Sequence, residues 1–195
     1  MFKIICVTNR SLCKENFLVR INRIAQASPE AIILREKDLT EHEYYILAKD
    51  VIEICDRYKI QCILHNFITV ALDLNHSAIH LPYSKLKDLS ENEKKQFKIL
   101  GASCHSIDDA LYAQKKGCTY ITAGHIFETD CKKGLPGRGL DFLENICNQI
   151  DIPVYAIGGI SQKNISRIKN TGASGACIMS GFMCGENINE LIEME

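Results

Sequence analysis

AIILREKDLTEHEYYILAKDVIEICDRYKIQCILH, residues 31–65, contains two β-rich apolar runs that are separated by a helical pattern. Residues 31–35 and 60–65 have the composition of strands. Between them, a helix is predicted over 41–57, with an apolar stripe at helical spacing formed by Tyr45, Leu47, Ala48, Val51, Ile52 and Ile54. A strand, a helix and a second strand in this order indicate a parallel βαβ unit.

The same alternation continues through all 195 residues. Further strands are predicted at 3–7, 77–81, 98–103, 119–126, 153–158 and 175–180. Further helices are predicted at about 15–27, 67–74, 90–95, 107–116, 140–149, 162–171 and 186–194. This series favours an α/β fold, a minimal (β/α)8 TIM barrel forming one domain over 1–195. A doubly wound open sheet is the alternative, because it needs no closure.

Composition excludes several classes of protein. The net charge is -1 with no basic stripe, so nucleic acid is not an expected partner. Apolar runs are too short for a membrane span, and the N-terminus resembles a first strand rather than a signal peptide. Cysteines in predicted strands (Cys6, Cys62, Cys104 and Cys177) suit small buried groups, and no CxxC pair is present. We therefore expect a cytoplasmic protein with reduced cysteines and no zinc site; whether it forms a homo-oligomer stays open.

Residues 122–139, TAGHIFETDCKKGLPGRG, place a titratable group where a barrel has its chemistry. His125 lies at the predicted end of the sixth strand, and a polar loop with two lysines follows. The carboxyl ends of parallel strands are where reacting groups emerge. We predict that His125 transfers protons on an anionic substrate, with Lys133, ahead of Lys132, as an anion contact.

Two glycine turns indicate a phosphate site. AIGGI (156–160) and IMSG (178–181) follow the seventh and eighth strands, where such barrels commonly bind phosphate. Glycine lets backbone N–H groups approach a ligand closely. The predicted phosphate contacts are Gly158, Gly159, Ser180 and Gly181. Ordinary tight turns are the alternative, since glycine is also their usual residue.

Seven segments together resemble the thiamine phosphate synthase superfamily over nearly the whole chain. They are CVTNR (6–10), ILREKDL (33–39), HSAIHLPYSKL (76–86), LGASCHS (100–106), AGHIFETDCKKG (123–134), PVYAIGGI (153–160) and GASGACIMSG (172–181). The resemblance implies a barrel that handles a phosphorylated thiazole or pyrimidine in thiamine biosynthesis.

Two activities compete within that superfamily. Synthases couple a pyrimidine diphosphate to thiazole phosphate, with Mg²⁺ held by two aspartates. Asn66 and Lys85 stand at the matching positions here, whereas Mg²⁺ prefers carboxylate oxygens. The segment around His125 is instead similar to the TenI branch, which carries GHxFETDCKKGLxGRG with Val or Ile at the first x. That likeness implies a thiazole tautomerase.

The main hypothesis is therefore a tautomerase that isomerises a carboxythiazole phosphate from its ylidene form to the aromatic form. His125 would be the acid–base group, a small phosphorylated thiazole the substrate, and no cofactor or metal is expected. The alternatives are a thiamine phosphate synthase and a non-catalytic, TenI-like regulatory protein.

Other polar residues near predicted strand ends are candidates for substrate binding. Arg35 and Lys37 match synthase positions that hold the diphosphate, and alternation along a strand points both the same way. In the tautomerase they would hold the substrate carboxylate, and a relic of the synthase site is the alternative. His65 is predicted at the mouth of the site, where it would either assist proton transfer or only pack, and Ser103 matches a synthase substrate contact. Structural or surface roles are expected for His42, His76, His80 and His105.

Overall fold

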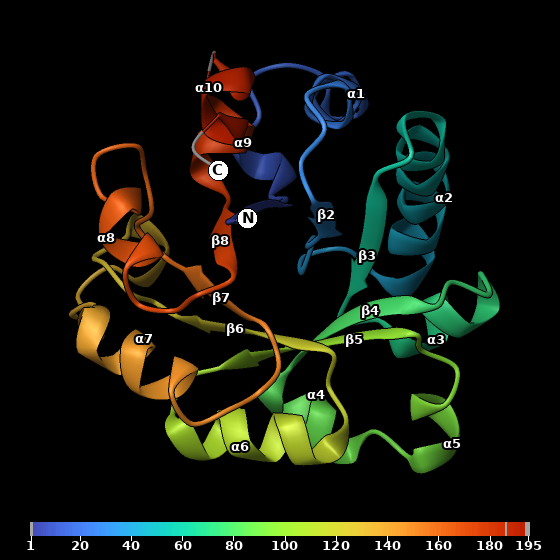
Figure 1. Cartoon of the computed structure of the whole chain (residues 1–195). Coiled ribbons are helices and arrows are strands. Elements are labelled where there is room, and N and C mark those ends of the chain that lie inside the picture. The colour runs from blue at the N-terminus through green and yellow to red at the C-terminus, as the bar shows by residue number, and fades with distance from the viewer. Residues whose placement is uncertain (1, 186, 194–195) are drawn as a thin grey trace.

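The computed structural model describes residues 2–185 and 187–193, and in it eight parallel strands close into a barrel in chain order (Figure 1). The strands are β1 (Lys3–Val7), β2 (Ala31–Leu34), β3 (Gln61–His65), β4 (Ala78–Pro82), β5 (Ile99–Cys104), β6 (Tyr120–Gly124), β7 (Val154–Ile157) and β8 (Gly175–Ile178). Pairing of β1 with β8 closes the ring. The TIM barrel is thus confirmed and the open sheet is excluded.

Helices surround the barrel and connect its strands. They are α1 (Phe17–Gln26), α2 (Glu41–Tyr58), α3 (Ile68–Asp73), α4 (Tyr83–Asp88), α5 (Glu91–Lys94), α6 (Ile107–Lys116), α7 (Gly139–Cys147), α8 (Ile165–Lys169), α9 (Ser180–Cys184) and α10 (Ile188–Ile192). Short 3₁₀ turns span Arg10–Leu12 and Asp130–Lys132. Part of the helix predicted at 186–194, namely 186 and 194, lies outside the described residues, as do the ends of the predicted domain, 1 and 194–195. One domain over the whole chain stays a prediction.

Two helices differ from the sequence expectation. The strand predicted at 175–180 ends at Ile178, and Ser180 begins α9 instead. Pro82 directly precedes α4, a helix that the sequence pattern does not predict. Helix α4 begins at the residue after β4 and α9 begins two residues after β8, so the periodicity of these short segments does not mark the change of structure.

Helix α2 is fixed by its caps and by a buried tyrosine that contacts the ends of two strands. Thr40 and Glu43 form a reciprocal capping box at its start, and Lys59 ends it in the left-handed conformation. Tyr44 rather than Tyr45 is fully buried, because its hydroxyl has backbone partners inside. That hydroxyl donates to Leu34 O at 2.6 Å and accepts from His65 N at 2.8 Å. Tyr44 thus joins the ends of β2 and β3.

Apolar residues form two separate cores, one inside the barrel and one between strands and helices. The inner core consists of Ile5, Val7, Ala31, Ile33, Ile63, Ala78, Tyr120, Tyr155 and Cys177. Polar groups share that interior, including buried His65, His80 and Thr122. All ten cysteines are free, and those predicted in strands are buried there.

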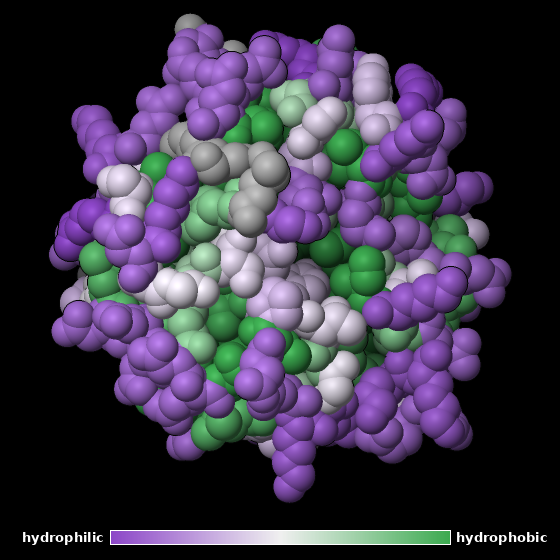
Figure 2. Space-filling view, in the orientation of Figure 1, coloured by the Kyte–Doolittle hydropathy of each residue, from purple (hydrophilic) through white to green (hydrophobic). Residues whose placement is uncertain are grey.

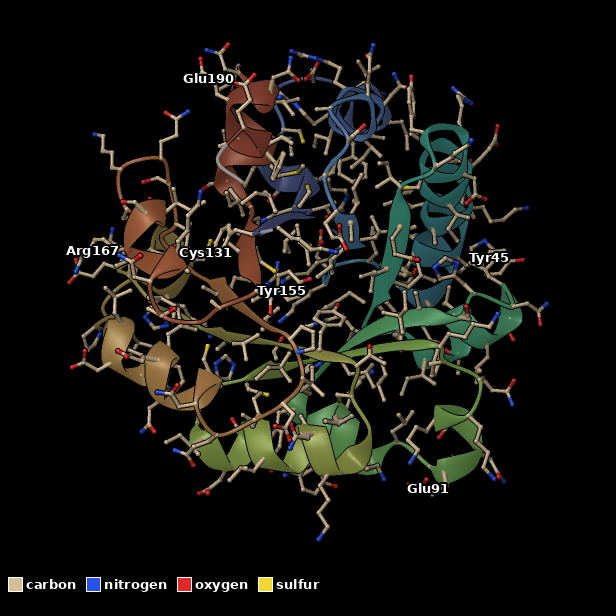
Figure 3. All side chains as sticks on the ribbon, viewed as in Figure 1. Tyr45, Glu91, Cys131, Tyr155, Arg167 and Glu190 are labelled. Atoms are coloured by element: carbon tan, nitrogen blue, oxygen red, sulfur yellow. The ribbon has the colours of Figure 1, made fainter. Side chains whose placement is uncertain are left out.

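Hydrophilic side chains cover much of the face shown in Figure 2, with smaller apolar areas between them. Glu91, Arg167 and Glu190 lie at the outside of the molecule, whereas Tyr155 lies within the ring of strands (Figure 3). Within the described residues, no helix combines the length and apolar character required to cross a bilayer.

Candidate active site

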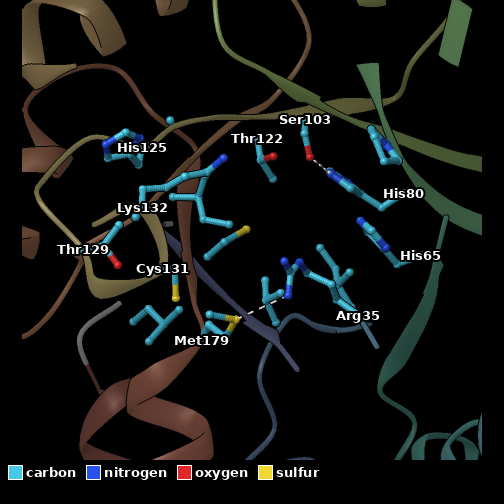
Figure 4. A pocket seen from close by; sticks show the side chains of 18 of the residues that line it. Arg35, His65, His80, Ser103, Thr122, His125, Thr129, Cys131, Lys132 and Met179 are labelled. Carbon is cyan, nitrogen blue, oxygen red and sulfur yellow. Dashed lines mark hydrogen bonds between the residues drawn. The ribbon is translucent and has the colours of Figure 1, made fainter. Parts of the chain in front are cut away.

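A cavity of about 460 Å³ lies where the strands end. Each of the eight strands, or the segment that follows it, contributes to the lining. Figure 4 shows the polar side chains around this space. None of the described residues that line it is an aspartate or a glutamate. Among these described residues, an anionic ligand therefore meets no acidic side chain.

Three cations line this cavity, and we call Arg35, Lys37 and Lys132 the cationic wall. Arg35 and Lys37 follow β2, while Lys132 arrives from the loop after β6. In Figure 4, the side chains of Arg35 and Lys132 both extend toward the cavity. Partial burial, the charge of Arg35 and the charge of Lys132 lower the pKa of Lys37. An anion would relieve this mutual repulsion.

Glu36, between the two β2 cations, is turned away from the cavity and buried. Its carboxylate accepts from Thr8 Oγ1 at 2.6 Å and from Arg10 N at 2.9 Å. Burial raises the pKa of Glu36, and the hydrogen bonds from Thr8 and Arg10 oppose that rise. Arg10 in turn pairs with Asp38 at 2.6 Å. The nearby carboxylates thus bind Thr8 and Arg10 and leave the cationic wall without an ion pair among the described residues.

Deeper in the barrel lies a set of neutral polar groups, which we call the buried polar layer: His65, His80, Ser103 and Tyr120. The two imidazoles stack with ring centroids 5.9 Å apart. His80 Nε2 is 2.8 Å from Ser103 Oγ, and His80 Nδ1 is 3.0 Å from Tyr120 Oη. Burial lowers the pKa of His80 to about 3. Burial, followed by the electrostatic interactions with His80, Arg35, Lys37 and Lys85, also lowers the pKa of His65. Both rings are neutral at pH 7.

His125 is in the cavity lining, with Nε2 donating to Leu135 O at 3.3 Å. The two loop lysines separate. Lys132 lines the cavity, whereas Lys133 lines only an adjacent open pocket that also includes Glu128 and Asp130. The loop therefore supplies to the main cavity Lys132, the lysine that the sequence pattern favours less.

The remaining histidines have different surroundings. His105 lines the cavity and donates from Nδ1 to Gly124 O at 2.8 Å. His76 donates to Cys62 O at 2.9 Å, and His42 is exposed on α2.

The glycine turns after β7 and β8 reach the same cavity. Gly158 and Gly159 line it with positive φ values of 100° and 67°. A side chain at Gly159 would place Cβ 2.3 Å from Glu128 O, so the backbone needs glycine there. Ser180 also lines the cavity, whereas Gly181 packs near Ile178 and Leu191 and is outside the lining. Phosphate binding at these turns stays a prediction.

The Mg²⁺ positions implied by the family resemblance do not fit the ion. Asn66 follows β3 in the left-handed region, at φ 73°. Lys85 Nζ on α4 donates to Asn66 O at 3.1 Å, which places an ammonium group there. In the part of the chain that the structure describes, no three His, Cys, Asp or Glu residues are grouped to hold a metal. A carbonyl already bound to an ammonium group is a poor Mg²⁺ ligand.

Comparisons with known proteins identify relatives along nearly the whole chain. A family model described as thiamine monophosphate synthase matches residues 4–182. The thiamine-phosphate synthase of Clostridium tetani is 34% identical, over 96% of this chain and 90% of the relative. Thiamine-phosphate synthase 2 of Streptococcus pneumoniae serotype 4 is 35% identical, over 93% and 88%. The solved thiamine phosphate pyrophosphorylase of Pyrococcus furiosus has a TM-score of 0.84 at 28% identity, covering 99% of this chain and 93% of that one.

These findings correct the main functional hypothesis. The tautomerase expected from 122–139 is wrong, because relatives matching nearly the full chain are named as synthases. That hypothesis gives one loop more weight than the other elements that shape the cavity. The comparisons support the superfamily and do not distinguish the TenI branch within it.

Proposed function

Because this chain belongs to the thiamine monophosphate synthase family, we propose that it is a thiamine-phosphate synthase. In the proposed reaction, a pyrimidine diphosphate is coupled to a thiazole phosphate. The observation that carries the proposal is the similarity to named synthases over at least nine-tenths of the chain. The cavity agrees with it, since cations line the space and none of the lining residues that the structure describes is acidic.

The cationic wall would bind the diphosphate. Coupling breaks the C–O bond between the pyrimidine's methylene carbon and the diphosphate, which leaves with the electron pair. The thiazole nitrogen then supplies the electron pair of the new C–N bond. Arg35, Lys37 and Lys132 would stabilise the negative charge that develops on the departing oxygen. Arg35 can also contact two oxygens at once with its planar guanidinium group.

The thiazole phosphate would use the part of the cavity that the turns after β7 and β8 line. Gly158, Gly159 and Ser180 line the cavity there, so their backbone N–H groups and the serine hydroxyl would bind the phosphate. Val7, Ile33 and Cys177 provide apolar surface for a heteroaromatic ring between the two anionic ends. This placement leaves Arg35 and Lys37 for the diphosphate of the second substrate.

No step in this proposal runs through Mg²⁺. Asn66 and Lys85 are unsuited to the ion, and the charge of Lys85 repels it. The chain's own cations would supply the charge that a divalent ion provides elsewhere. Lys85 would add to the positive field near His65 from the side of α4.

The direct test is to incubate the purified chain with both substrates and to measure thiamine phosphate and released diphosphate in equal amounts. Lys49→Ala, on the exposed side of α2, is a control that should leave the rate unchanged. If the wild type binds both substrates yet forms no coupled product at any Mg²⁺ concentration, the proposed function is wrong.

A further inference from the structure

Three residues on neighbouring strands form a hydrogen-bonded chain from the barrel interior to the cavity. Tyr120 on β6 contacts His80 on β4, and His80 contacts Ser103 on β5 (Figure 4 shows the second contact). Tyr120 and His80 are buried, whereas Ser103 is half-buried and lines the cavity. A group deep in the core is therefore linked to one that a ligand can touch.

Gly101 makes this chain possible. In the strand register it lies beside both His80 on β4 and Tyr120 on β6. A Cβ atom at Gly101 would lie 2.2 Å from Cζ of Tyr120, so the phenol ring occupies the space that glycine leaves. The ring passes over β5 and reaches His80 on the strand beyond it. Tyr155 packs edge-on against Tyr120 at 5.7 Å and supports the ring from β7.

Hydrogen-bond satisfaction determines the direction of this chain. The Tyr120 hydroxyl is buried, and His80 Nδ1 is its hydrogen-bond partner among the described residues. If Nδ1 carried the proton, the phenolic hydrogen would be buried without an acceptor, which costs free energy. Tyr120 therefore donates to Nδ1, and a neutral imidazole must then carry its proton on Nε2. Nε2–H donates to Ser103 Oγ, which leaves the serine hydrogen free to point into the cavity.

We propose that Tyr120 and His80 are positioning residues that make Ser103 a hydrogen-bond donor to an uncharged acceptor on the substrate. The acceptor class is a ring nitrogen of a heteroaromatic ring, since the cationic wall is better suited to the diphosphate. This assignment rests on the proposed function for the identity of the ring, and on the structure alone for the direction of the hydrogen bonds. Ser103 touches the ligand; Tyr120 and His80 act through it.

The first experiment determines the direction of the hydrogen bonds between Tyr120, His80 and Ser103, and it needs no substrate. Nitrogen-15 NMR of labelled protein distinguishes the two neutral tautomers of His80, with His80→Gln assigning the signal. The expected result is a proton on Nε2 in the wild type and a mixture of tautomers in Tyr120→Phe. If His80 of the wild-type protein carries its proton on Nδ1, the proposal is wrong, whether or not the protein couples its substrates.

The second experiment measures how the hydrogen bonds between Tyr120, His80 and Ser103 affect the binding of a ligand. Calorimetry compares binding of the pyrimidine alcohol, which lacks the diphosphate, with binding of inorganic diphosphate. Tyr120→Phe and Ser103→Ala should each weaken binding of the pyrimidine alcohol about five- to tenfold, which corresponds to the loss of one neutral hydrogen bond. The affinity for diphosphate should stay within about twofold of the wild-type value. Because both changes remove the same bond, the double variant should be no weaker than Ser103→Ala.

Tyr155→Phe is the matched control, since Tyr155 is 7% exposed and Tyr120 6%. It should leave binding of both probes unchanged. Additive losses in the double variant would mean that Tyr120 only packs, and the proposal would fail. If His80 carries its proton on Nε2 but the wild type forms no coupled product, the proposed function fails and the direction of the hydrogen bonds stands.

Discussion

The cationic wall and the buried polar layer face one cavity but hold their polar groups in opposite ways. In the wall, the lysine side chains are exposed and come from loops, so water can solvate their charges and a ligand can bind them. In the layer, His65, His80 and Tyr120 are buried, and the imidazoles stay neutral. The difference follows from solvation, because an isolated charge is costly inside a barrel and inexpensive at its mouth.

This contrast divides the work of substrate recognition. Charge at the mouth would attract and hold the diphosphate, whereas directed hydrogen bonds at depth would recognise the ring. Substitutions can be placed in one region at a time, so the division is testable.

The largest effect is expected from removing charge in the wall. Arg35→Ala with Lys37→Ala should lower kcat/KM by about 10²–10⁴-fold, because each charge-assisted hydrogen bond is worth about 1.5–3 kcal/mol. Steady-state kinetics and calorimetry with inorganic diphosphate measure the loss. Lys37→Arg should retain more activity than Lys37→Ala. Normal diphosphate binding in the double variant would show that the wall is not the binding site.

A smaller effect, on stability, should come from His80 in the polar layer. The pKa of His80 is about 3 in the fold and 6.5 is its ordinary value. Below pH 6.5, His80 is protonated in the unfolded chain but stays neutral in the folded protein. The free energy of unfolding therefore decreases as the pH falls toward 3. His80 should contribute about 1.4 kcal/mol of this loss per pH unit across most of that range.

Urea unfolding at several pH values tests this expectation. His80→Gln should show a pH slope shallower than that of the wild type by that amount, and His42→Gln, on the exposed side of α2, should not. Equal slopes in His80→Gln and the wild type would mean that His80 does not resist protonation in the fold.

Lys132→Ala should have a more modest effect, because Lys132 is exposed. Diphosphate binding should weaken about two- to fivefold, the range for an exposed ion pair. The charge of Lys132 also lowers the pKa of Lys37. In Lys132→Ala, the pH above which Lys37 loses its proton and diphosphate binding declines should therefore be higher. Calorimetry between pH 7 and pH 10.5 measures both, with Lys133→Ala as the control from the adjacent pocket. A larger loss in Lys133→Ala would exchange the roles of the two lysines.

The smallest effect should follow removal of divalent cations. With the cations of the wall holding the diphosphate, coupling in EDTA should stay within about twofold of coupling in Mg²⁺, since Asn66 and Lys85 provide no carboxylate. Product formation after dialysis measures this. A strict requirement for Mg²⁺ would contradict the charge assignment and leave the synthase proposal intact.

Several features of the site follow from local sequence patterns. Alternation along the extended chain predicts that Arg35 and Lys37 share one side, and both line the cavity. Glycines after the last two strands indicate turns that also line it. The same patterns do not separate α4 and α9 from the strands before them, because each helix starts within two residues of a strand end. They also mislead on the activity, because residues 122–139 are a short segment within a much longer match.

The sequence by itself determined the barrel, because parallel strands buried on both faces leave apolar runs whose alternation with helices can be counted. Only the tertiary structure decided which polar groups meet. Tyr120, His80 and Ser103 come from three strands, and their contact depends on the register of those strands and on the space above Gly101. Periodicity is a local property and is recorded in the order of residues. Register between strands is fixed when the barrel closes and one set of side chains becomes its interior, so it depends on residues that are far apart in the sequence.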